Sequence, residues 1–132
     1  MRDRLATAAL VIALAGRVAA AEQATVIVTA KDNGRTVSLS EGQELELRLA
    51  ANRSTGYSWS VEHTPEPVLT QEGDPTYTSD VTPGPGVGAP GTETWRFRAA
   101  QAGRRTLRME YQRPWEREKP PAAVVTLRIV VE

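Results

Sequence analysis

The chain has 132 residues, with 16 Lys and Arg, 16 Asp and Glu, one His and no Cys, and 40% of the residues are hydrophobic. These values fit one soluble domain and leave no room for a second core. The balanced charge argues against a nucleic-acid partner, which requires a clear excess of basic residues. The lack of Cys excludes disulfides, a thiol nucleophile and a thiolate zinc site.

The amino-terminal segment has the layout of a secretory signal peptide. Arg2 and Arg4 precede an apolar stretch at 5–15, and the small residues Ala19 and Ala21 follow it. The apolar stretch is shorter than the roughly 20 residues that span a bilayer. We therefore do not expect a membrane anchor.

Cleavage is expected after Ala21, with cleavage after Ala20 as the neighbouring alternative. Residues 1–21 would then be the signal peptide and residues 22–132 the folded domain, periplasmic or secreted and monomeric. The signal contains three Arg and one Asp, so the remainder carries 13 basic and 15 acidic residues. The exported domain is therefore nearly neutral, and without Cys its packing alone must hold the fold.

Apolar and polar residues alternate with period two through most of the remaining chain, which indicates β-strands. In chain order, strands are expected at 25–29, 36–40, 44–49, 57–62, 76–81, 92–99, 106–111 and 123–131, with a further short strand possible at 68–71. Asn33-Gly34 predicts a tight hairpin between the first two strands. Seven or eight short strands separated by turn signals predict an all-β fold, an immunoglobulin-like antiparallel β-sandwich.

The apolar positions of these strands define the expected core. They are Leu45, Leu47, Leu49, Tyr57, Trp59, Val61, Trp95, Phe97, Ala99, Leu107, Met109, Tyr111, Val125, Leu127, Ile129 and Val131. Tyr57 is also placed to brace the connection that precedes it.

Three connections emerge at one end of the sandwich if each strand reverses the direction of the previous one. We call them the first loop (51–56), the second loop (82–91) and the third loop (112–122). The second loop is nearly all Gly and Pro, which suits either a flexible connection or close backbone contact with a partner. In the third loop, Trp115 follows a Pro, and binding and packing are equally open as its role.

The three loops together resemble the chagasin-like inhibitors of papain-type cysteine peptidases. That family carries Asn-Pro-Thr-Thr-Gly-Tyr, then Gly-x-Gly-Gly, then Arg-Pro-Trp in the corresponding loops. Here the order and spacing are kept by Asn52 to Tyr57, Gly88 to Gly91 and Arg113 to Trp115.

The resemblance implies a reversible, non-covalent inhibitor that occludes the active-site cleft of a papain-like cysteine peptidase with the three loops. It implies that Thr55 lies near the catalytic Cys of the target, that the second loop pairs its backbone with one wall of the cleft, and that Trp115 packs on an aromatic residue of the other. The implied peptidase-binding residues are Asn52, Ser54, Thr55, Gly56, Gly88, Ala89, Pro90, Gly91, Arg113, Pro114 and Trp115.

Three residues depart from the family pattern. Arg53 stands where the family usually has Pro, so the first loop loses a fixed φ angle and gains a long cation. Ser54 stands where Thr is usual. Pro90 replaces a Gly, which removes a backbone N–H and narrows the conformations open to the second loop. Beside the third-loop Trp, Arg113 is expected to orient that loop or to contact the target, with a solvated side chain as the alternative.

Other chemistry has weaker support. His63 is the one His, and no nucleophile elbow accompanies it, so we expect no enzyme activity. Glu72, Asp74 and Asp80 lack the spacing of a calcium loop and are expected to be solvated, so no metal or cofactor is expected. The alternative to a peptidase inhibitor is an exported immunoglobulin-like module that binds a carbohydrate or an adhesion partner through the same loops.

Overall fold

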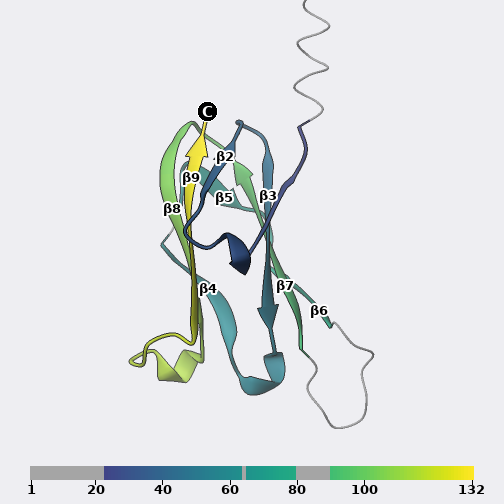
Figure 1. The fold of residues 1–132 in the computed structure, drawn as a ribbon, viewed down its shortest axis with the longest axis vertical. Helices are drawn as coiled ribbons and strands as arrows, with labels where there is room; N and C mark the ends of the chain where they lie inside the picture. The colour runs from purple at the N-terminus through teal and green to yellow at the C-terminus, as the bar shows by residue number, and fades with distance from the viewer. Residues whose placement is uncertain (1–22, 64, 80–89) are drawn as a thin grey trace, which may run out of the picture.

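The computed structural model describes residues 23–63, 65–79 and 90–132, which form two facing β-sheets (Figure 1). The strands are β1 (Val26–Thr29), β2 (Thr36–Leu39), β3 (Glu44–Ala51), β4 (Ser58–His63), β5 (Leu69–Gln71), β6 (Thr76–Ser79), β7 (Gly91–Ala99), β8 (Gly103–Gln112) and β9 (Ala123–Val131). Three short 3-10 helices lie between them: η1 (Ala30–Asp32), η2 (Arg53–Thr55) and η3 (Pro114–Glu116). The predicted all-β sandwich is confirmed.

Each sheet is mixed rather than purely antiparallel. One sheet has the order β1-β3-β7-β5, with β6 also pairing with β7, and the other has the order β2-β9-β8-β4. The central pairs β3–β7, β8–β9 and β4–β8 are antiparallel. However, β1 pairs with β3 and β2 pairs with β9 in parallel. The prediction of an antiparallel sandwich is therefore right for the centre of each sheet and wrong for these two edge strands.

The core is built from the alternating positions that the sequence singles out. Leu47 lies opposite Trp95 in one sheet, and Leu107 lies opposite Leu127 in the other. Among the predicted core residues, only Tyr57, Val61 and Tyr111 are partly rather than fully buried. Each of these three lies on β4 or β8 or directly before β4, on the sheet that carries the third loop.

The predicted hairpin at Asn33-Gly34 is wrong. Thr29 caps η1 at the end of β1, and the Asp32 carboxylate accepts a hydrogen bond from the Thr29 backbone N–H at 2.9 Å. Asn33 has a φ of −50°, so only Gly34 takes the positive φ that a tight hairpin needs at both positions. Asn33 Oδ1 instead accepts from the Thr126 backbone N–H at 2.7 Å, and the chain crosses to β9 in the other sheet.

The strand directions bring the first and third connections, and the two ends of the second, to one end of the sandwich, at the bottom of Figure 1. There β3 leads into β4 through η2, and β8 leads into β9 through η3. β6 ends and β7 begins at this same end. The carboxyl terminus lies at the opposite end. The predicted signal peptide at 1–21 lies outside the described residues, and among those described no helix has the length and apolar character to cross a membrane.

Candidate functional site

The first loop is held in shape by its own hydrogen bonds. Asn52 caps η2: its Oδ1 accepts from the Ser54 backbone N–H at 3.2 Å and from the Ser54 hydroxyl at 2.6 Å. The Thr55 hydroxyl donates to the Asn52 carbonyl at 2.7 Å. Gly56, with a φ of 82°, ends the turn in a left-handed conformation that other residues adopt only at a cost. Ser54 and Thr55 are thus exposed to a partner on a turn whose shape is already set.

A column of aromatic rings connects the first loop to the core. The Asn52 backbone N–H donates to the Tyr111 hydroxyl at 2.9 Å. The Tyr111 ring stacks on Tyr57, with centroids 5.2 Å apart, and contacts Trp59, with centroids 4.9 Å apart. Trp59 in turn donates from Nε1 to the Ala50 carbonyl at 3.0 Å. The prediction that Tyr57 braces the first loop is confirmed by this packing.

Arg113 joins the third loop to the first. Its Nε donates to the Thr55 carbonyl at 3.0 Å, and its guanidinium carbon lies 4.6 Å from the centroid of the Tyr57 ring. Glu116 holds the same guanidinium from within the third loop, with a 3.4 Å ion pair. Pro114 occupies the first position of η3, where its fixed φ and missing N–H are tolerated. Arg113 therefore has the orienting role that the sequence suggested for it.

Trp115 is the most exposed large hydrophobic residue in the described part of the chain, with 70% of its surface accessible. The edge of its six-membered ring rests on Gly56. A Cβ added to Gly56 would lie 2.5 Å from Trp115 Cη2. The indole is therefore braced by the first loop but not buried, which favours binding over packing as its role.

The second loop is described only at its ends. Gly88 and Ala89 lie outside the described residues, whereas Pro90 is exposed and Gly91 begins β7. Gly91 is buried, and a Cβ there would lie 2.5 Å from the Thr78 carbonyl oxygen and from the Tyr77 ring. The glycine at this position is thus required by packing against β6, whatever its role toward a partner.

Glu93 is a residue of this end that the sequence reasoning missed. It is 4% exposed and accepts a hydrogen bond from Trp95 Nε1 at 2.8 Å. Burial raises the pKa of the Glu93 carboxyl, and the Trp95 hydrogen bond and the positive charge of Arg53 oppose this rise. The alternation of Trp95, Phe97 and Ala99, continued two residues toward the start of β7, already places Glu93 on the core side.

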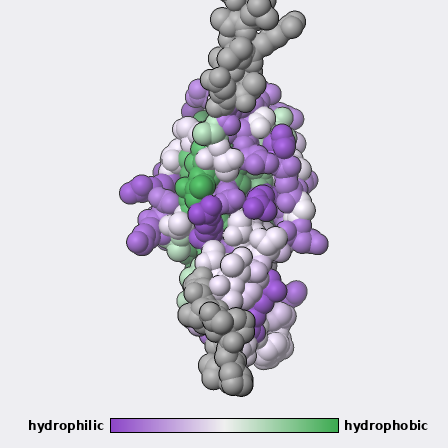
Figure 2. Space-filling view, turned by 90° about the vertical axis from the view of Figure 1, so that its right-hand side faces the viewer, coloured by the Kyte–Doolittle hydropathy of each residue, from purple (hydrophilic) through white to green (hydrophobic). Residues whose placement is uncertain are grey.

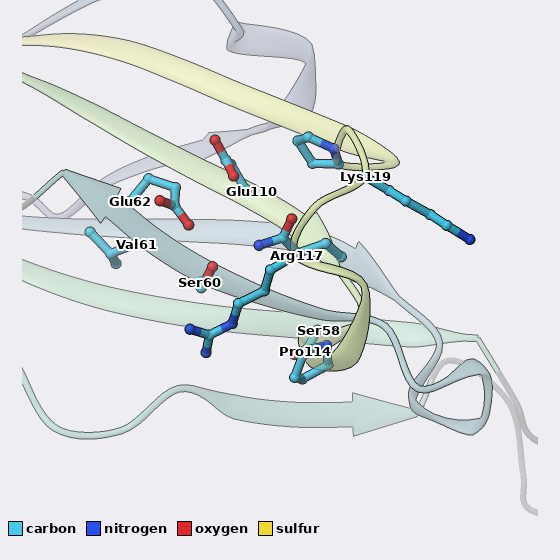
Figure 3. Close-up of a pocket in the computed structure, with 10 residues that line it drawn as sticks. Ser58, Ser60, Val61, Glu62, Glu110, Pro114, Arg117 and Lys119 are labelled. Atoms are coloured by element: carbon cyan, nitrogen blue, oxygen red, sulfur yellow. The ribbon is translucent and has the colours of Figure 1, made fainter.

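A polar groove runs beside the third loop (Figure 3). It has a volume of about 510 Å³ and lies between outward-facing residues of β4 and β8 and the returning chain of the third loop. Figure 3 shows the Arg117 side chain extending toward Ser60, while Lys119 points away. Its open, polar character is unlike the enclosed apolar pockets that hold small molecules. We therefore assign the candidate site to the loops and not to this groove.

The rest of the described surface offers few competing sites. Figure 2 shows a face covered mainly by hydrophilic residues around a small hydrophobic area. Ile27 on β1 and Trp115 are the exposed large hydrophobic residues that the described ranges contain. Those ranges hold no cluster of three metal-ligating side chains; Asp80, one of the three acidic residues considered above, lies outside them. His63 ends β4 next to an irregularity in its pairing with β8.

The fold and the site together define a β-sandwich binding protein that presents a braced aromatic residue and preformed turns at one end. Comparison with known proteins specifies this class further. The pattern of the family described as "Chagasin family peptidase inhibitor I42" matches residues 38–129. The chain belongs to this family, whose members are peptidase inhibitors and not enzymes.

Individual relatives agree with this assignment. The chain is 30% identical to Amoebiasin-2 of Entamoeba histolytica over 105 residues, which cover 80% of this chain and 84% of that protein. It is 28% identical to Chagasin of Trypanosoma cruzi over 92 residues, covering 67% and 81% of the two chains. The crystal structure of the cysteine protease inhibitor EhICP2 from Entamoeba histolytica superimposes with a TM-score of 0.74 at 28% identity, covering 84% of this chain and 98% of that one.

Proposed function

We propose that the protein is a reversible, non-covalent inhibitor of papain-like cysteine peptidases. The observation that carries the proposal is Trp115, 70% exposed yet braced on Gly56 beside a first loop whose turn is already formed. A large rigid aromatic residue contributes contact area at a small cost in conformational entropy. The first and third loops are tied to each other before any partner is bound, so little ordering is left for the binding step.

Occlusion of the cleft is the proposed mechanism. Thr55 and Ser54 would enter the cleft beside the catalytic Cys, Trp115 would pack on one side, and the second loop would pair its backbone with the other. The chain has no Cys, so it has no thiol with which to form a mixed disulfide with the target. Inhibition is therefore proposed to be competitive and reversible.

The test is a titration of the purified protein against a panel of papain-like cysteine peptidases, followed by dilution. We expect competitive inhibition that is relieved by dilution, with the inhibitor recovered at its original mass. A lack of inhibition across the panel would refute the proposed function. Inactivation that survives dilution, or an adduct in the intact mass, would refute the non-covalent mechanism.

We also propose that the protein is exported after cleavage of residues 1–21 and acts as a monomer in the periplasm or outside the cell. The support is the sequence pattern of Arg2 and Arg4, the short apolar stretch and the small residues before Glu22. Amino-terminal sequencing of the exported fraction tests this proposal, with Glu22 or Ala21 expected as the first residue. An intact Met1 in that fraction would contradict it.

A further inference from the structure

Arg53 lies on η2, in the connection between the two sheets, and its side chain reaches β6 in the sheet that contains β3. Its guanidinium carbon lies 4.5 Å from the centroid of the Tyr77 ring on β6. A cation over the face of an aromatic ring at this distance is attracted by the ring's quadrupole. Arg53, one of the two residues by which this first loop departs from the usual family pattern, therefore has a defined partner within the same molecule.

The ring under Arg53 is itself fixed. Tyr77 is half-buried and packs against the core, and its ring lies across Gly91, where a Cβ would be 2.5 Å from the Tyr77 hydroxyl oxygen. It lies opposite Glu93 in the pairing of β6 with β7. The ring is thus a firm surface on the strand pair that bounds the second loop, and not a mobile side chain.

A buried negative group adds a second reason for the cation to lie there. Glu93 faces the core side of β7, next to Tyr77 on one flank and Leu49 on the other. The positive charge of Arg53 opposes the rise that burial causes in the pKa of the Glu93 carboxyl. The guanidinium is therefore attracted both by the face of a ring and by a carboxylate that has lost most of its water.

The first loop is consequently held from two sides. On one side Arg113 donates to the Thr55 carbonyl and ties η2 to the third loop. On the other side Arg53 ties η2 to β6, in the sheet that contains β3 and β7. The two arginines lie on different loops and hold the same short turn to the two different sheets.

We propose that Arg53 is a positioning residue, whose contact with Tyr77 fixes the first loop relative to the strands β6 and β7 so that peptidase binding needs no rearrangement between them. The inference rests on the proposed inhibitory function. In this role Arg53 acts through Tyr77 within the inhibitor, and not by touching the peptidase. Removing either partner should therefore have the same effect, and removing both should add little.

The test is a double-mutant cycle on the inhibition constant with Arg53→Ala, Tyr77→Leu and the combined variant. Each single variant should weaken inhibition about 3- to 10-fold, the range of one partly desolvated cation–ring contact. The combined variant should be no more than about 2-fold weaker than either single one. Arg53→Lys and Tyr77→Phe, which keep a cation and a ring, should retain most of the inhibition.

Arg96→Ala is the matched control. Arg96 is an exposed arginine on the outer face of β7 that pairs with Glu46, so the variant makes the same change in net charge away from the loops. It should inhibit like wild type. If Arg53→Ala weakens inhibition equally in the presence and absence of the Tyr77 ring, Arg53 acts on the peptidase directly and the proposal is overturned.

Amide hydrogen exchange separates this inference from the proposed function. In the free protein, the amides of residues 54–57 should exchange faster in Arg53→Ala and in Tyr77→Leu than in wild type. In the combined variant they should exchange no faster than in either single variant. This result would support the positioning role even if wild type inhibited none of the peptidases. Unchanged exchange in both single variants would overturn the role, whether or not wild type is an inhibitor.

Discussion

Removal of the Trp115 side chain is the most direct test of the loop-end site. An indole residue presents about 150–250 Å² when free, so the 70% that remains accessible leaves about 105–175 Å² for a partner to cover. At about 25 cal/mol per Å² this area corresponds to about 3–4 kcal/mol, close to the range of about 2–4 kcal/mol for a strong anchor residue. Trp115→Ala should therefore raise the inhibition constant by about 30- to 1000-fold.

The same variant should leave the fold almost unchanged, because the indole covers Gly56 but is not part of the core. The measurement is an inhibition constant paired with a thermal melt. Ile27→Ala is the control, since Ile27 is 50% exposed but lies on β1 and on none of the loops. A large loss of melting temperature in Trp115→Ala would show that the residue packs the fold, and unchanged inhibition with an unchanged melt would remove it as the anchor.

Three further variants test the first loop and the buried carboxylate. Gly56→Ala should lower the free energy of unfolding by about 1–2 kcal/mol, because position 56 has a left-handed backbone conformation. The added Cβ should also weaken inhibition by displacing the indole of Trp115. A urea titration that gives wild-type stability would contradict this prediction. Thr55→Ala should weaken inhibition less than Trp115→Ala does, because it removes one neutral hydrogen bond that contributes about 0.5–1.5 kcal/mol. A loss of inhibition equal to or larger than that of Trp115→Ala would contradict this ranking. The pKa of Glu93 is raised in the folded state, so the folded protein binds more protons and wild type loses stability as the pH rises above 4.5 through that raised value. Glu93→Gln lacks this loss, so its stability relative to wild type should increase as the pH rises above 4.5, and a difference that stays constant in urea titrations at successive pH values would argue against the assignment.

The sequence was informative where structure depends on local pattern. The strict alternation of Leu45, Leu47 and Leu49 predicted a strand with one buried face, and these three side chains are fully buried. The order of strands then predicted which connections share one end. For Trp115 after Pro114 the sequence left packing and binding equally open, and the structure shows the side chain exposed.

The features that the sequence did not predict depend on contacts between distant residues. Asn33-Gly34 has the local signal of a hairpin, but its outcome was decided by a hydrogen bond to Thr126, 93 residues away. The contact of Arg53 with Tyr77 joins the turn η2 to the strand β6, which are 24 residues apart in the sequence, so no local spacing reveals it. Glu93 was missed for a different reason, because a charged residue is usually assigned to the solvent side of a strand even when the alternation places it inside.

The two sheets end in short or irregular strands. β1, β2 and β6 have four residues each, and β5 has three. β5 and β6 divide one side of β7 between them, and the longer edge strand β4 is interrupted by a bulge between Val61 and His63. Long flat edges are what allow one β-protein to add a strand to another and aggregate. A sandwich whose described edges are this short can expose a tryptophan at one end while giving neighbouring copies little to pair with along its sides.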